Sequence, residues 1–413
     1  MKLQQMKLKE ALKYNKRWVY IVLGIIFMMF LGTVYSYSVF RVALEKDLMI
    51  GAAESGMPYM VALAFYALFM FLTGRYIEKF QAKKILILGG LLVSLGWILS
   101  SFVSNIFLLT ITYGCISGAG VGIAYGVPLS VIAKWFPDKK GIAVGLILIG
   151  FGLSPLVTAP IARSLVESYG VMKTFFILGV SFAVMLPILA ILFKYPSDEE
   201  VLIFNKKVNQ SSENSPDLTL KQMIRTKSFK GVYLNFLIGT MIGLMVVGMT
   251  INVGLDYFQL DSPTVTRTMA IFAIFNGVGR PAFGWVTDRY SSRKAMTISY
   301  FLIMSSAMGL VTSGKHTLVY ILTFSIFWFN LGGWLAIAPT STLKLYGIKN
   351  NSQNYGLVFT AYGVGAIAGV STSGLILDYY GNYDYVFYYI IVLCMVGIIL
   401  ATKYINNKTE KIG

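Results

Sequence analysis

Twelve apolar segments run through this chain, and each is long enough to cross a lipid bilayer as a helix. A membrane-spanning helix needs about 20 mostly apolar residues. Only 13% of the 413 residues are charged, whereas soluble domains carry about 25%. We therefore predict an all-α integral membrane protein whose twelve transmembrane helices occupy 18–42, 55–78, 83–102, 105–133, 140–164, 171–194, 229–256, 263–288, 294–313, 317–343, 353–378 and 384–405.

One long polar stretch separates six of these segments from the other six. It contains "DLTLKQMI", which can form a short amphipathic helix, although the stretch as a whole favours a plain connector lying on the membrane surface. The chain thus divides into an N-terminal half at 1–194, a cytoplasmic linker at 195–228 and a C-terminal half at 229–413. With the N-terminus in the cytoplasm, most of the 35 Lys and Arg residues fall in cytoplasmic segments, as the positive-inside rule requires. We predict a multi-pass protein of the cell (inner) membrane with both termini cytoplasmic, whose net charge of +17 reflects topology and not nucleic-acid binding.

Each half carries a similar charged stretch after its second apolar segment. "GRYIEKFQAKKIL" at 74–86 and "GWVTDRYSSRKAM" at 284–296 both have Gly, three residues, an acid, a base and an aromatic residue. An acid at a helix end can pair with nearby bases and with the N-terminus of a neighbouring helix, so these stretches can form a gate that breaks in another state. The alternative is a topology signal with no switching role. The candidate gating residues are Gly74, Glu78, Lys79, Gly284, Asp288, Arg289 and Arg293.

Arg280 is the one Lys or Arg residue that this topology places deep inside a predicted span. It lies about 12 Å from the span end near Asp288, at ~1.5 Å per residue, and a charged side chain at that depth marks a cavity or a function. Every Asp and Glu falls in a loop, a linker, a tail or at a span end, and the nearest candidate is Asp256. We predict that a bound anion neutralises Arg280. The alternative is an arginine satisfied by carbonyl, Asn and Tyr groups.

Polar and aromatic side chains in other spans can complete the wall of this site. Asn276 lies four residues before Arg280 and so shares its helix face. Tyrosine hydroxyls can bond a carboxylate while their rings supply an apolar floor, although each aromatic residue taken singly is more typical of helix packing than of ligand contact. Tyr37 and Trp334 belong to the same stretches. The predicted substrate-binding residues are Arg280, Asn276, Tyr35, Tyr125, Trp328, Asn330 and Tyr362.

Two six-span halves with this charged motif resemble the major facilitator superfamily. The match is good at 284–294, whereas the first copy has Glu78 and Lys79 where the family has Asp and Arg. "YSYSVF", "NGVGRPAFGWVTDR" and "NYGLVFTAYGVGAIAG" look like the oxalate:formate antiporter branch, which is allied to monocarboxylate transporters. The resemblance implies two six-helix halves related by pseudo-two-fold symmetry around a central cavity, with Arg280 as the anion ligand. It also implies a second cation in oxalate carriers, a lysine, where this chain has Tyr362.

A single deep cation favours a small monocarboxylate over a dianion. We predict a secondary active transporter of a carboxylate anion of the lactate, pyruvate or formate class, working by alternating access in the lipid bilayer. Coupling to protons and exchange for a counter-substrate anion both stay open. The alternatives are a dicarboxylate antiporter of the oxalate type and a drug efflux carrier of the same fold. No catalytic or metal-binding motif is evident, so we predict no enzyme activity and no cofactor.

Overall fold

The computed structural model describes residues 2–74, 76–77, 80–136, 140–197, 200, 217–347 and 350–405, and the side chains of these residues except 2–16, 140–142 and 352. Every regular element in these ranges is helical. The elements before the linker are α1 (Lys2–Leu31), η1 (Gly32–Ser36), α2 (Tyr37–Leu48), α3 (Ala52–Gly74), α4 (Ala82–Ser100), α5 (Ile106–Leu109), η2 (Thr110–Ser117), α6 (Gly118–Trp135), α7 (Lys140–Tyr169) and α8 (Val171–Leu192).

The second series begins with a short helix that falls in the predicted amphipathic stretch. Its Thr219 forms a capping box with Gln222, and its Met223 is buried. The elements are α10 (Leu220–Arg225), α11 (Lys227–Asn252), η4 (Val253–Tyr257), α12 (Ser262–Arg289), α13 (Ser292–Thr312), α14 (Thr317–Tyr346), α15 (Asn351–Tyr380) and α16 (Asp384–Tyr404).

Eleven helical runs in the described part of the chain are long and apolar enough to cross a membrane. Helix α12 is not among them, yet it has 28 residues. At ~1.5 Å per residue it is about 42 Å long, which is enough to span the bilayer. All twelve predicted segments are therefore helical, and the prediction of an all-α membrane protein is confirmed.

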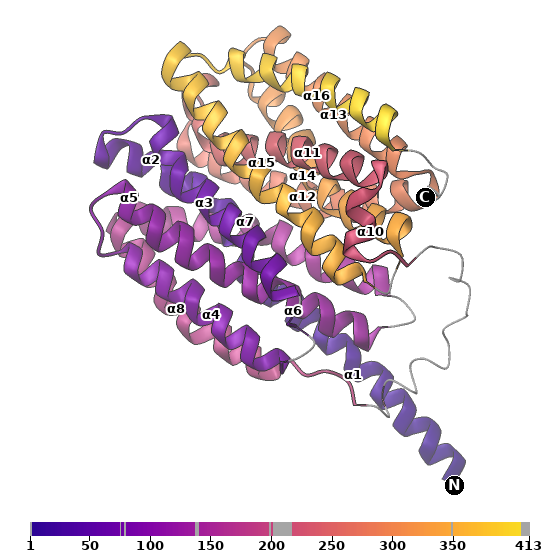
Figure 1. Cartoon of the computed structure of the whole chain (residues 1–413). Coiled ribbons are helices and arrows are strands. Elements are labelled where there is room, and N and C mark those ends of the chain that lie inside the picture. Colours follow the sequence, from indigo (N-terminus) through magenta and orange to yellow (C-terminus); the bar gives the residue numbers. More distant parts are fainter. Residues whose placement is uncertain are drawn as a thin grey trace.

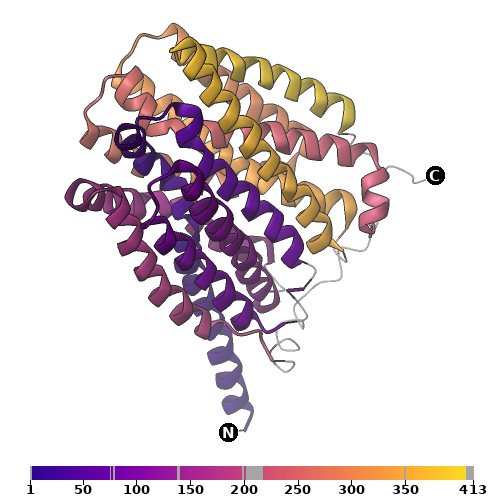
Figure 2. The ribbon, with the colours of Figure 1, turned by 60° about the vertical axis from the view of Figure 1, so that its left-hand side comes forward.

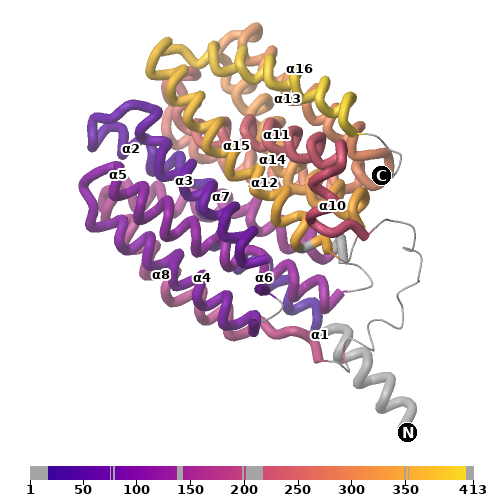
Figure 3. Tube along the Cα trace, viewed as in Figure 1, coloured from indigo at the N-terminus to yellow at the C-terminus, as the bar shows by residue number. Residues whose placement is uncertain are grey.

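The helices form two groups. Figure 1 shows α1–α8, the first helix group, on one side and α10–α16, the second helix group, on the other. The view in Figure 2 and the tube in Figure 3 follow the same arrangement. Between the groups, α3 packs along α15 and α7 packs along α12. We call the surface along which these two helix pairs meet the seam between the groups.

The two ends of the bundle are distinguished by the chain segments they carry. We call the end at which α8 and α16 finish and α10 lies the terminus face. We call the end at which α2 finishes and α3 begins the opposite face, and the turn between α15 and α16 lies there too. Each spanning helix therefore runs from one of these faces to the other.

The first span differs from its prediction at the opposite face. Helix α2 continues to Leu48, whereas the predicted span ends at residue 42. Arg41 therefore lies inside the helix, only 3% exposed, and not at the outer edge of the span. It pairs with Glu45 one turn later, so the charges that ended the hydropathy signal neutralise each other within the helix. The prediction that Arg280 is the only Lys or Arg inside a span is wrong for this reason.

Candidate functional site

Arg280 is buried without a matching set of acceptors. Its side chain, in the interior of α12, is 2% exposed. Nη2 lies 3.5 Å from Oδ1 of Asn276, and among the described residues Nε and Nη1 have no hydrogen-bond partner. No carboxylate in the described part of the chain forms an ion pair with this guanidinium. A guanidinium has five N–H donors, and leaving such donors unpaired in a buried site costs free energy.

Three helices meet at Asn276 and fix it beside Arg280. The Nδ2 group donates to the backbone oxygen of Trp328 in α14, at 3.1 Å. A Cβ at Gly332 would lie 2.0 Å from the backbone oxygen of Asn276, so only glycine lets α14 come this close. On the other side, a Cβ at Gly152 of α7 would lie 2.5 Å from Asn276 Oδ1. The amide therefore lies at the seam between the two helix groups.

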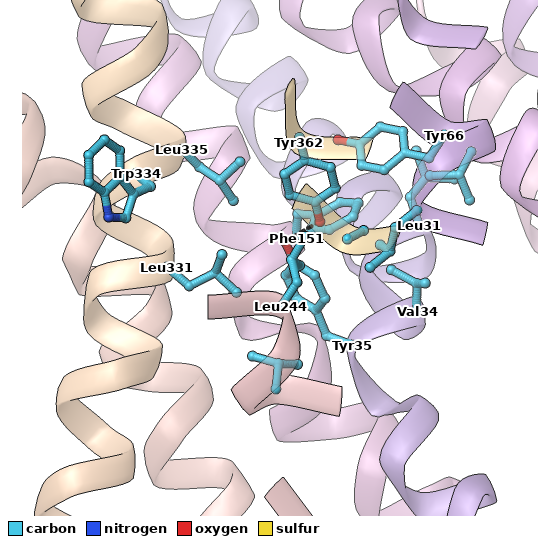
Figure 4. Close-up of a cluster of buried hydrophobic side chains, with 14 of the residues drawn as sticks. Leu31, Val34, Tyr35, Tyr66, Phe151, Leu244, Leu331, Trp334, Leu335 and Tyr362 are labelled. Carbon is cyan, nitrogen blue, oxygen red and sulfur yellow. Dashed lines mark hydrogen bonds between the residues drawn. The ribbon is translucent and has the colours of Figure 1, made fainter. Parts of the chain in front are cut away.

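Two tyrosines from different helix groups meet by their hydroxyls. Tyr35 lies in the 3₁₀ segment η1, and its hydroxyl is 2.9 Å from that of Tyr362 in α15. Figure 4 shows Tyr35, Tyr66, Phe151 and Tyr362 gathered in one place. The Arg280 Cζ lies 5.9 Å from the centre of the Phe151 ring, and Phe151 in turn packs edge-on to Tyr35 at 5.1 Å. These contacts connect the tyrosine pair to the arginine.

The predicted residue Tyr125 completes this aromatic wall. Its ring packs against Phe151 at 5.4 Å and against Tyr66 at 5.0 Å. The hydroxyls of Tyr35, Tyr125 and Tyr355 lie within range of the Arg280 charge, and the Tyr125 hydroxyl is placed where it can also accept a hydrogen bond from this guanidinium. The structure thus brings together Arg280, Asn276, Tyr35, Tyr125 and Tyr362.

Sequence reasoning missed three members of the wall: Tyr66, Phe151 and Tyr355. Phe151 stands between two glycines in "IGFGL", a pattern that could have indicated a helix contact point. Tyr66 and Tyr355 lie in stretches that contain other aromatic residues, so nothing in the sequence distinguishes them.

Other predicted residues lie at the edge of the site or away from it. Trp328 is bonded through Nε1 to Thr250, and its ring centre is 6.5 Å from that of Tyr35. Asn330 donates to Ile326 in its own helix, and the described residues give it no hydrogen bond to Arg280. In Figure 4, Trp334 lies apart from the tyrosines, on the far side of α14.

The charged stretch at the end of α12 makes its contacts at the terminus face. Lys344 Nζ lies 3.9 Å from Asp288 Oδ1 and donates to the backbone oxygens of Thr287 and Asp288 at 2.8 and 3.0 Å. It therefore caps the C-terminus of α12, as a cation does favourably. The Nε group of Arg293 donates to the backbone oxygen of Ile405 at 2.7 Å.

For the remaining predicted gating residues, the structure gives at most a position in a helix. Gly74 ends α3, Gly284 lies inside α12, and Arg289 is exposed at the end of that helix. Glu78 and Lys79 lie outside the described residues. The gating role of the stretch therefore stays a prediction.

Comparison with protein families gives a match over most of the chain. The model described as "Major Facilitator Superfamily" matches residues 21–348 and 255–412.

Curated relatives match at lower identity over most of their length. The chain is 26% identical over 351 residues to "Uncharacterized MFS-type transporter YhjX" of Escherichia coli (strain K12), covering 85% of this chain and 86% of that protein. It is 25% identical over 373 residues to "Oxalate:formate antiporter" of Oxalobacter formigenes, with 89% and 86% covered. It is 26% identical over 370 residues to "Monocarboxylate transporter 12" of Xenopus laevis, with 82% and 78% covered.

Solved structures match the arrangement of helices. A bacterial homolog of the human lysosomal transporter Spinster, in an inward-facing and occupied conformation, has a TM-score of 0.70 at 11% identity, covering 94% of this chain and 96% of that one. A POT family transporter in complex with 5-aminolevulinic acid has a TM-score of 0.68 at 16% identity, with 92% and 94% covered. At such low identity these matches show the fold alone.

Proposed function

The chain belongs to the Major Facilitator Superfamily, and from that premise we propose that it carries a small monocarboxylate across the cell membrane by alternating access. It is a secondary transporter and not an enzyme. The substrate site that we propose is the surrounding of Arg280. Lactate, pyruvate, formate and acetate are the class of anion that fits one cation within an aromatic wall.

One observation supports this proposal more than any other: Arg280 is buried with two nitrogen atoms that no described residue accepts from. A carboxylate has two oxygens that accept two parallel N–H bonds from a guanidinium. Such a ligand would supply both the missing charge and the missing acceptors. The oxalate:formate antiporter and the monocarboxylate transporter among the relatives are named for small carboxylates, which agrees with this ligand class.

The neutral tyrosines favour a single negative charge. Tyr35 and Tyr362 offer hydroxyls but no cation, and both are buried. The second carboxylate of a dianion would be buried without a charge partner, which is costly. A methyl or hydroxymethyl tail can instead lie against the rings of Phe151 and Tyr66. This argument separates a monocarboxylate from oxalate, the substrate class of the second candidate.

Orientation follows from the distribution of basic residues. We assign the terminus face to the cytoplasm, in agreement with the positive-inside rule. The halves at 1–194 and 229–413 would then rock about the seam formed by α3, α15, α7 and α12. Each rocking step would expose Arg280 to one face at a time.

Uptake into proteoliposomes tests the proposed function. Purified protein should take up labelled C1–C4 monocarboxylates, and other monocarboxylates should compete better than oxalate or malonate. Runs with and without an internal counter-substrate separate exchange from net uptake. Arg280→Ala should abolish uptake, whereas Arg289→Ala, an exposed arginine on the same helix, should not. Transport of lipophilic cations in place of carboxylates would contradict the proposal and favour a drug carrier.

A further inference from the structure

The opposite face is closed by a second buried arginine, each of whose three side-chain nitrogens donates a hydrogen bond. Arg41 Nε donates to Glu45 Oε1 at 3.0 Å and to Ser55 Oγ at 2.8 Å. Nη2 donates to the backbone oxygen of Ala52 at 2.5 Å. Nη1 donates to the backbone oxygen of Gly248 at 3.0 Å, and Gly248 belongs to α11 in the second helix group. One side chain therefore ties α2, α3 and α11 together.

Glu45 is the carboxylate at the centre of this contact. Besides Arg41, its Oε1 accepts from Ser55 Oγ at 2.5 Å, and its Oε2 accepts from Asn252 Nδ2 in α11 at 2.8 Å. These bonds depend on its negative charge, because hydrogen bonds to an ionised acceptor are roughly twice as strong as neutral ones. We call Arg41, Glu45, Ser55, Asn252 and the Gly248 carbonyl the opposite-face lock.

A cavity of about 280 Å³ gives water access to the lock. Glu45 is 23% exposed, whereas Arg41 is 3% exposed, so solvent reaches the acid before the base. A proton can therefore arrive at the carboxylate while the guanidinium is still buried. The polar residues that line the cavity are Arg41, Glu45, Asn252, Asp256, Asp378 and Tyr383.

The other acids around this cavity have different partners. Asp256 of η4 accepts from the hydroxyl of Tyr383, which precedes α16, at 3.2 Å. Asp378 of α15 accepts from the backbone N–H groups of Ala52 and Ala53, at 2.8 and 3.0 Å. In the described part of the chain, neither acid forms an ion pair with the buried arginine. A proton on either of them would leave the charge of the arginine balanced.

We infer that Glu45 is a proton-binding site that controls the opposite-face lock. A proton delivered by water in the cavity forms an O–H bond with one carboxylate oxygen, and the side chain becomes neutral. The bonds from Ser55 and Asn252 then weaken, and Arg41 keeps its charge in a buried position without a counter-ion. Removing one partner of a buried ion pair in this way is strongly unfavourable, so separation of the helix groups, which lets Arg41 reach water, is favoured.

The sign of the pH effect follows from which form makes the lock. The ionised carboxylate makes it, so the lock is closed at high pH and opens as pH falls. A transporter controlled in this way would open its opposite face in response to acid on that side. The role of the opposite-face lock in transport rests on the proposed function, whereas the experiment that tests the lock needs no substrate.

A distance measurement across the opposite face tests the inference. Met49 after α2 and Tyr379 in α15 are 90% and 82% exposed, in different helix groups, and suit cysteine substitution and spin labelling. Cys115→Ser and Cys394→Ser remove the native thiols. The full chain in nanodiscs, without substrate, is titrated by pulsed electron paramagnetic resonance from about pH 7 to about pH 3, a range that spans the ordinary pKa of a Glu carboxyl group, about 4.3. We expect the ratio of the long-distance population to the short-distance population to rise by up to about tenfold for each pH unit that the pH falls, which is the limit for binding of a single proton.

Variants decide whether Glu45 is the responsible acid. Glu45→Gln should show the longer distance at every pH, whereas Asp256→Asn and Asp378→Asn should keep the response. Asn252→Ala, which removes the donor in the second helix group, should raise the longer population at high pH and is a second test where Glu45→Gln does not fold. The inference would be overturned if the distance distribution of the wild type did not change with pH, or if Glu45→Gln showed the same pH dependence as the wild type.

The proposed function fails separately from this inference. If the wild type shows the pH response but binds no carboxylate, the substrate assignment is wrong and the lock stands. If carboxylate binding depends on Arg280 but the distance ignores pH, the lock assignment is wrong and the substrate assignment stands.

Discussion

Two arginines of this protein are almost equally buried, at 3% exposure for Arg41 and 2% for Arg280, yet their surroundings differ. Arg41 donates through Nε, Nη1 and Nη2 to a carboxylate, a hydroxyl and two carbonyls. Arg280 has one long hydrogen bond, to Asn276, and two nitrogens that lack an acceptor among the described residues. Burial alone therefore does not identify a ligand site. The informative quantity is how many donors the fold leaves unpaired.

The difference can be stated in terms of charge. A buried charge is tolerated when a partner and hydrogen bonds compensate for the lost hydration. The fold compensates Arg41 with Glu45, so this arginine contributes to the structure itself. In the described part of the protein it leaves Arg280 uncompensated, and such intramembrane charges are typical of functional sites. Four predictions test or sharpen this contrast.

The largest effect should follow from removing the unpaired arginine. Truncating one partner of a buried charged pair costs about 2–5 kcal/mol, so Arg280→Ala should weaken carboxylate binding by roughly 30- to 3,000-fold. Arg280→Lys keeps the charge but loses the planar fork, so its carboxylate affinity should lie between those of the wild type and Arg280→Ala. Isothermal titration calorimetry on purified protein measures both, with Arg289→Ala as the control. Unchanged affinity in Arg280→Ala would show that the anion binds elsewhere.

The second effect is on the stability of the substrate-free protein, which should respond differently to substitution of the two arginines. Arg41→Met leaves Glu45 without its cation and should destabilise the substrate-free protein by about 2–3 kcal/mol, slightly below the usual range because Glu45 reaches water. Arg280→Met removes an uncompensated charge and should leave stability unchanged or raise it. Thermal unfolding in detergent without substrate compares the two. Equal destabilisation by both substitutions would mean that Arg280 is satisfied in the substrate-free fold.

A third, smaller effect should follow from adding a second cation near Arg280. Tyr362→Lys supplies a partner for a second carboxylate and removes a hydroxyl that bonds Tyr35. We expect the ratio of oxalate to monocarboxylate inhibition to rise about tenfold, equivalent to about 1.4 kcal/mol. Competition assays on the wild type and the variant, with Tyr362→Phe as the control, give this ratio. A wild type that already prefers oxalate would contradict the one-cation argument.

The smallest effect should come from the charged pair at the terminus face. Asp288 and Lys344 are 68% and 40% exposed and 3.9 Å apart, and exposed pairs contribute about 0–1 kcal/mol. Asp288→Asn should therefore shift the conformational equilibrium toward the form open at the terminus face by about fivefold or less. Turnover should fall by a similar factor, with little change in substrate affinity. Cysteine labelling at the exposed Leu343 follows the shift. No change in labelling would leave Asp288 as a topology residue.

Hydropathy was sufficient to predict all twelve membrane helices but not the end of the first. An ion pair one turn apart, such as Arg41 and Glu45, is neutralised inside the helix, whereas a hydropathy profile counts it as two charges. The sequence therefore places Arg41 at the edge of the predicted span and Glu45 beyond it, which hides the opposite-face lock. A charge pair spaced by four residues at the edge of a predicted span is the signal that could have extended it.

The site was predictable where a polar residue stands out in an apolar span. Arg280, Asn276 and the Tyr35–Tyr362 pair are of this kind, and the structure places them together. Phe151 could not be identified, because in a helix that is apolar on most sides the sequence does not fix which side faces the site. Asn330 stays a prediction: in the structure its amide nitrogen donates to Ile326 of its own helix.

Asp378 lies in the second helix group, yet its carboxylate accepts from the first two N–H groups of α3 in the first group. The first turn of one helix is thus completed by a residue of the other group. If the groups separate at this face as proposed, the amides of Ala52 and Ala53 lose their acceptor and should exchange their hydrogens with deuterated solvent more readily. Mass-spectrometric exchange at this helix start would therefore report which face is open in unlabelled protein.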